Sequence, residues 1–88
     1  MKNMKDAVRK LNLWIRISKV DLSKFYNIDF SRFGIIHLQG DFNIENRKYC
    51  DTFFSDYELE YNEKFKQLIY TREKRKYEFI SKIKVTLI

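Results

Sequence analysis

Apolar and polar positions alternate most regularly in the last twelve residues of the chain. The odd-numbered positions carry Tyr77, Phe79, Ser81, Ile83, Val85 and Leu87, and most even-numbered positions between them are polar. Successive side chains of a strand point to opposite faces, so this pattern predicts a half-buried strand over residues 77–88. If the strand lies at a sheet edge, its free backbone groups could pair with a second copy, and a homodimer through this C-terminal edge strand is one hypothesis.

Two earlier segments, residues 57–61 and 65–70, alternate in the same way. A short polar turn separates them, and residues 71–76 form the next predicted turn before the final strand. The three segments predict an antiparallel meander. Such a sheet is stable only if another element covers its apolar face.

The register of this meander follows from the predicted loop length. A three-residue loop pairs Tyr61 with Phe65 and sets Glu60 opposite Lys66 on the outer face. The inner face then carries five apolar side chains: Tyr57, Leu59, Tyr61, Phe65 and Ile69.

The N-terminal segment fits two patterns. Met4, Val8, Leu11, Ile15 and Ser18 form one helical stripe, whereas the alternation between residues 11 and 17 also fits a strand. We predict a helix over residues 4–18, because the meander needs a cover and the stripe is long.

The next segment predicts a hairpin. Asp21 can cap a single helical turn that ends near Tyr26. Residues 28–30 and 35–39 then read as strands, and Gly34 between them can adopt a positive φ. This hairpin would extend the sheet.

A central helix is predicted next. Asn43 can cap a helix over residues 44–54, with Cys50, Phe53 and Phe54 facing inward. The alternative is a hairpin turn at Gly40-Asp41 followed by a strand.

The fold class is therefore α+β, with an antiparallel sheet of about five strands covered by an N-terminal and a short central helix. Residues 1–88 form one small domain.

Composition narrows the function classes. The single cysteine excludes an internal disulfide and a cysteine-rich metal site. No apolar run approaches the length of a membrane span, and the segment after the basic N-terminus is broken by Asn12 and Arg16, which disfavours a signal peptide. We expect a cytoplasmic protein with no membrane contact, cofactor or metal.

Catalytic candidates are weak. His37, Gln39 and Asp41 share one side of their predicted strand, but four residues of strand span ~13 Å, so His37 and Asp41 cannot touch unless the chain bends. Cys50 has no visible partner that would lower its pKa, and a buried structural thiol is favoured. An enzyme is the weakest hypothesis.

Charge suggests a binding protein. The net charge is +5 for residues 1–20, −4 for residues 21–62 and +5 for residues 63–88. The candidate nucleic-acid site is a basic hairpin tip with flanking tyrosines and a basic strand: Arg72, Lys74, Arg75, Lys76, Tyr70, Tyr77, Lys82 and Lys84. These side chains could neutralise phosphates and stack on bases, which predicts a module for nucleic acid or a nucleoprotein. The alternative is a solvated turn that aids solubility.

The acidic middle supports a second hypothesis. Asp56, Glu58 and Glu60 share a strand face. Neighbouring carboxylates there lie ~7 Å apart, and Lys66 is expected to pair with Glu60, so a charged outer face is favoured over a metal site. Such a face could meet a basic host protein, as in a small phage or mobile-element accessory protein that masks a host factor.

Overall fold

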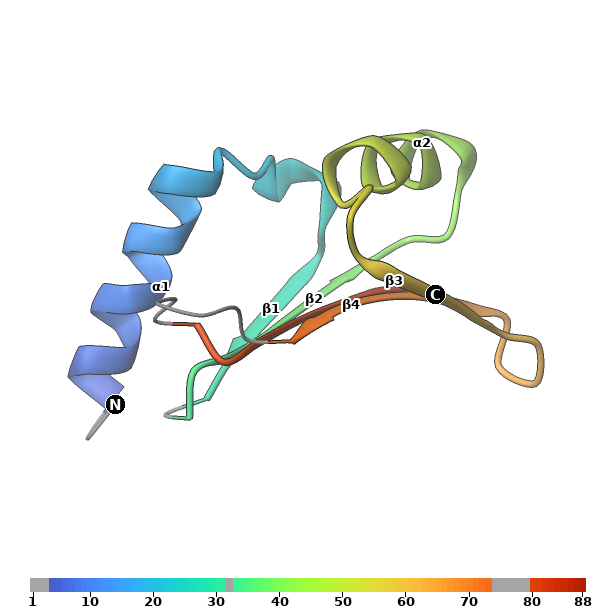
Figure 1. The fold of residues 1–88 in the computed structure, drawn as a ribbon. Coiled ribbons are helices and arrows are strands. Elements are labelled where there is room, and N and C mark those ends of the chain that lie inside the picture. The colour runs from blue at the N-terminus through green and yellow to red at the C-terminus, as the bar shows by residue number, and fades with distance from the viewer. Residues whose placement is uncertain (1–3, 32, 74–79) are drawn as a thin grey trace.

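Two helices lie on one side of a five-stranded sheet in the computed structural model of the chain (Figure 1). The structure describes residues 4–31, 33–73 and 80–88. In chain order the elements are α1 (Met4–Ser18), a 3₁₀ turn (Leu22–Lys24), β1 (Asn27–Phe30), β2 (Ile35–Gly40), α2 (Ile44–Phe53), β3 (Glu58–Asn62), β4 (Gln67–Glu73) and β5 (Lys82–Leu87). The predicted α+β class, with five strands and two helices, is confirmed.

The sheet is mixed, with the strand order β1-β2-β5-β4-β3. β3, β4 and β5 form the predicted antiparallel meander, but β2 pairs with β5 in parallel. The prediction of a purely antiparallel sheet is therefore wrong. The physical reason is α2, which connects β2 to β3. A helical connection returns the chain to the starting end of the sheet, so that the next strand can run in the same direction as the previous one.

β5 lies at the centre of the sheet, between β2 and β4. Ile83, Val85 and Leu87 are fully buried on the helix-bearing face, and Thr86 on the opposite face is only 4% exposed. The predicted alternation is confirmed over residues 82–87, whereas residues 77–79 lie outside the described ranges. Because both sides of β5 are already paired, the predicted homodimer through a C-terminal edge strand is wrong.

The predicted register between β3 and β4 is also wrong. Tyr61 pairs with Leu68 and Glu60 with Ile69. The loop covers residues 63–66, and Lys66 takes a left-handed φ of 51°, which non-glycine residues seldom adopt. An odd-numbered shift exchanges the two faces of a strand, so Ile69 leaves the predicted inner face.

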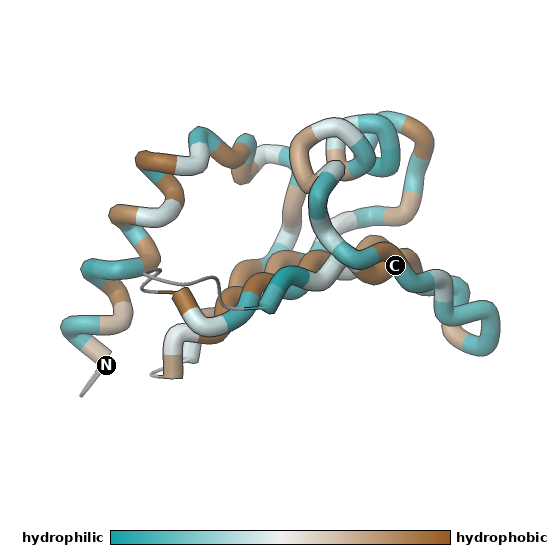
Figure 2. Tube along the Cα trace, viewed as in Figure 1, coloured by the Kyte–Doolittle hydropathy of each residue, from teal (hydrophilic) through white to brown (hydrophobic). Residues whose placement is uncertain are grey.

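The core lies between the helices and the middle strands. Trp14 of α1 and Cys50 of α2 are buried with the inward side chains of β2, β4 and β5. Phe54, 1% exposed, lies within an aromatic cluster, with its ring centroid 4.8 Å from that of Tyr57 and 6.3 Å from that of Tyr70. Figure 2 shows apolar residues concentrated along the central strands and polar residues at the β3–β4 loop. α1 spans the predicted residues, and its strand alternative is wrong.

Local signals explain the confirmed element boundaries. Asn43 caps α2, accepting a hydrogen bond from the Asn46 backbone N–H at 2.8 Å, so the alternative hairpin at Gly40-Asp41 is wrong. Gly34 has the predicted positive φ, 83°, in the β1–β2 turn. A Cβ on Gly40 would lie 2.8 Å from the Lys24 carbonyl oxygen, so close packing of the 3₁₀ turn requires glycine there.

Candidate functional site

The predicted basic site is only partly described. Lys74, Arg75, Lys76 and Tyr77 lie outside the described residues. Lys82 and Lys84 lie on the sheet face opposite the helices, here called the open face, as predicted for the outer face. Lys82 Nζ lies 3.4 Å from Glu73 Oε1.

The structure places Tyr70 and Arg72 differently from the prediction of a basic turn with an exposed tyrosine at its base. Tyr70 is 2% exposed, and its hydroxyl donates to Asp51 Oδ1 at 2.6 Å, so its ring cannot stack on a base. Burial, followed by the Asp51 carboxylate, raises the pKa of Tyr70. Arg72 belongs to β4 rather than to a turn, and its guanidinium lies 5.5 Å from the Tyr57 ring centroid on the helix-bearing face. The shifted register explains both errors.

The residues considered for catalysis are not assembled. His37 lies on the open face with Nε2 3.0 Å from Thr86 Oγ1, while Asp41 follows the end of β2. Burial, followed by the nearby Lys84 charge, lowers the pKa of His37. Gln39 accepts a hydrogen bond from Asn27 at 2.6 Å. Cys50 is buried, as predicted, and burial raises the pKa of its thiol to about 12, so it is protonated at neutral pH.

The acidic residues lie at one edge of the sheet. Glu58 and Glu60 share the open face of β3, and both are exposed. Their neighbours on β4 are Thr71 and Ile69, so the predicted pairing of Glu60 with Lys66 is wrong. Asp56 precedes β3 and is also exposed. Within the described ranges, no group of three or more His, Cys, Asp or Glu residues could hold a metal ion.

The other face of β3 is apolar and borders a groove. Leu59 and Tyr61 point to the helix-bearing side, yet they are 49% and 52% exposed. Two hollows of about 300 and 520 Å³ adjoin there, and Arg47 and Leu59 line both. We call them together the β3 groove, which runs between α2 and β3. Its further lining residues are Phe42, Asp51, Phe54, Ser55, Tyr57, Tyr61, Leu68 and Tyr70.

Side-chain contacts hold the wall of the β3 groove in place. Asp51 accepts the hydrogen bond from the buried Tyr70, and its second oxygen lies 3.6 Å from Arg47 Nε. Phe42 packs edge-on against Tyr61, with 6.3 Å between the ring centroids. The groove therefore has a mixed lining, in which the apolar side chains of Leu59 and Tyr61 lie near the polar groups of Arg47. This arrangement can contact an apolar side chain through Leu59 and Tyr61.

Sequence reasoning missed the β3 groove, because it assigned Leu59 and Tyr61 to the covered inner face. The available signal was Glu58-Leu59-Glu60-Tyr61 itself, which alternates charged and apolar residues. Charged residues are frequent on edge strands, where they discourage unwanted pairing. That signal does not show whether a helix covers the apolar face.

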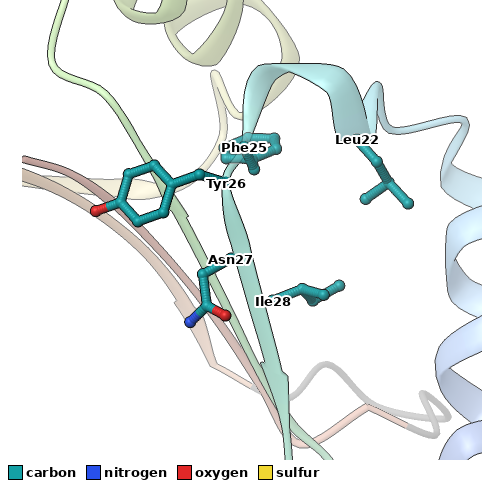
Figure 3. A pocket seen from close by; sticks show the side chains of 5 residues that line it. All are labelled: Leu22, Phe25, Tyr26, Asn27 and Ile28. Carbon is teal, nitrogen blue, oxygen red and sulfur yellow. The ribbon is translucent and has the colours of Figure 1, made fainter.

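A third hollow, of about 250 Å³, lies beside β1 (Figure 3). Its lining comes from one continuous segment: Leu22, Phe25, Tyr26, Asn27 and Ile28. Figure 3 shows Leu22 and Ile28 pointing toward α1, while Tyr26 and Asn27 point the other way. The side chains do not converge on one point, so this hollow is a weaker candidate than the β3 groove.

Comparison with known proteins identifies no relative of this chain, so a function has to be proposed from the geometry of the structure. No family model, curated protein or solved structure matches the chain. None of the helices in the described ranges has the length and apolar character needed to cross a bilayer.

Proposed function

We propose that this protein is a non-catalytic binding module that receives an extended segment of a partner protein as an added strand beside β3. The observation that carries the proposal is an edge strand with two half-exposed apolar side chains, Leu59 and Tyr61, next to a groove. In strand addition, backbone hydrogen bonds supply affinity and adjacent hollows select side chains.

The opposite edge is less suited to this role. β1 has four residues, and α1 packs against it. β3 has five residues, and four of them are exposed. In an antiparallel ladder, the backbone groups of every second residue of an edge strand point away from its partner. On β3 these groups are available to an incoming strand.

The proposal corresponds to the accessory-protein hypothesis, in which a small protein masks a host factor. Masking a partner by strand addition needs no catalytic group. Nucleic-acid binding stays a prediction. Lys82 and Lys84 on the open face support it, but Lys82 lies beside Glu73, and Tyr70 is buried.

The proposal is tested by selecting random displayed peptides of about ten residues, long enough for one strand, on the immobilised protein. Leu59→Ser and Tyr61→Ser should each weaken binding of the selected peptides about tenfold or more, because each removes apolar surface from the docking edge. Ile44→Ser is the matched control, since Ile44 is 74% exposed on α2 and does not line the β3 groove.

Selected peptides that bind the Leu59 and Tyr61 variants as tightly as the wild type would contradict the proposal. So would a selection that enriches no peptide. Equal losses in Ile44→Ser and Leu59→Ser would indicate general surface adhesion instead of a docking edge.

A further inference from the structure

We infer that the segment received by β3 alternates basic and apolar residues, with its basic side chains facing Glu58 and Glu60. This inference rests on the proposed function, because it specifies the partner chemistry of the same edge. The open face of β3 favours the basic residues of this segment. The helix-bearing face of β3 favours its apolar residues.

The open face of β3 selects positive charge. Glu58 and Glu60 are exposed, and their neighbours on β4, Thr71 and Ile69, are uncharged. Neither glutamate has an ion-pair partner in the part of the chain that the structure describes. A residue directly opposite on an added strand has its Cβ about 5 Å away, so Lys or Arg there would form a cross-strand ion pair.

The helix-bearing face of β3 selects apolar side chains. Leu59 and Tyr61 alternate with the two glutamates and border the β3 groove. On an added strand, the positions between the basic residues point to this side. Apolar residues at these positions would cover Leu59 and Tyr61 and remove both from water.

A second copy of this chain does not meet the requirement. Pairing β3 with β3 of another copy in the antiparallel sense would set Glu58 and Glu60 against the same glutamates on one face. Like charges directly opposite each other destabilise a sheet. The edge therefore disfavours self-association and favours a basic strand from a different protein.

The test uses three labelled peptides of about nine residues, each ~30 Å long when extended, in which Val alternates with Lys, Gln or Glu. In about 0.15 M salt, where charges are screened over ~8 Å, the Lys peptide should bind about tenfold tighter than the Glu peptide. The result is diagnostic, because the protein's formal net charge of +6 would favour the Glu peptide if only overall charge mattered.

A charge-reversed variant, Glu58→Lys with Glu60→Lys, should invert the order and bind the Glu peptide better than the Lys peptide. The matched control is Glu45→Lys with Glu63→Lys, which makes the same change in net charge outside β3 and should keep the wild-type order. Equal binding of all three peptides by the wild type would overturn the inference, although the proposed function would stand. If none of the three binds while displayed peptides still dock at Leu59, the inference is likewise overturned and the proposed function is kept.

Discussion

The two edges of the sheet differ in how they are protected. β1 is the shorter edge strand; α1 packs against it, and Ile28 and Phe30 pack against the core. β3 at the other edge leaves Leu59 and Tyr61 half-exposed, although α2 lies on the same side of the sheet. The apolar side chains of the β1 edge pack against the rest of the chain, while those of the β3 edge stay half-exposed.

This difference indicates that an edge strand is a position where a small domain can carry a binding surface at little cost to its stability. The central strands β2, β5 and β4 supply most of the large fully buried side chains, so we expect stability to depend little on covering β3. The charges of Glu58 and Glu60 disfavour unwanted pairing at the exposed edge. Under the proposed function, they also restrict which strands can pair with it.

The largest predicted effect concerns the support of the β3 groove. Phe54→Ala removes a ring that contacts Phe53 and Tyr57 at centroid distances of 4.9 and 4.8 Å, and should lower the free energy of unfolding by about 3–5 kcal/mol. Ile44→Ala should change it by less than about 0.5 kcal/mol, because Ile44 is exposed. Urea denaturation measures both values. A loss below about 1 kcal/mol for Phe54→Ala would show that the aromatic cluster does not support α2.

A smaller predicted effect is the difference in stability between a variant of the β1 edge and a variant of the β3 edge. Ile28→Ala on β1 should cost about 2 kcal/mol, because Ile28 packs against the core, whereas Leu59→Ala on β3 should cost less than about 1 kcal/mol. The same urea experiment separates them. Equal costs would remove the contrast on which the choice of β3 over β1 depends.

The smallest predicted effect is a pH dependence that should not involve β3. His37 has a lowered pKa, so the unfolded chain binds its proton more readily than the folded one does. The free energy of unfolding should therefore fall as pH drops through the unfolded value of about 6.5 toward the lower folded value. The groups nearest His37 are Lys84, Asp29 and Thr86.

The variant that tests this pH dependence is His37→Gln, measured by urea denaturation between about pH 7.5 and pH 5. The loss of stability over this range should be smaller in the variant than in the wild type. Peptide affinity at β3 should be unchanged by the substitution, since β5 and β4 separate β2 from β3. An affinity that follows the His37 titration would show that the open face, rather than the β3 edge, binds the peptide.

Much of the fold could be predicted because local signals decide it. The stripe on α1, the Asn43 cap and the positive φ at Gly34 depend on neighbouring residues only. The β3–β4 register could not be predicted, because Lys66 adopts a left-handed conformation that its residue type does not indicate. The parallel pairing of β2 with β5 could not be predicted from local sequence either, since it joins residues almost fifty positions apart.

The candidate site was less predictable than the fold. Tyr70 and Leu59 both alternate with other residues in predicted strands, yet Tyr70 is buried on the inner strand β4 and Leu59 is half-exposed on the edge strand β3. The glutamates beside Leu59 are a weak indication of an edge strand, but the strand order that places β3 at the edge depends on long-range pairing. Glu58 and Glu60 do share one face of β3, while Asp56 precedes the strand, and the role of the two glutamates depends on which strand forms the edge.

The central claim is that β3 accepts an added strand, and amide hydrogen exchange with a selected peptide tests it most directly. Outward-facing amides in residues 58–62 should exchange at least about tenfold more slowly when the peptide is bound, while amides in residues 27–30 should be unchanged. Protection confined to β1, or peptide binding without protection at β3, would contradict the account.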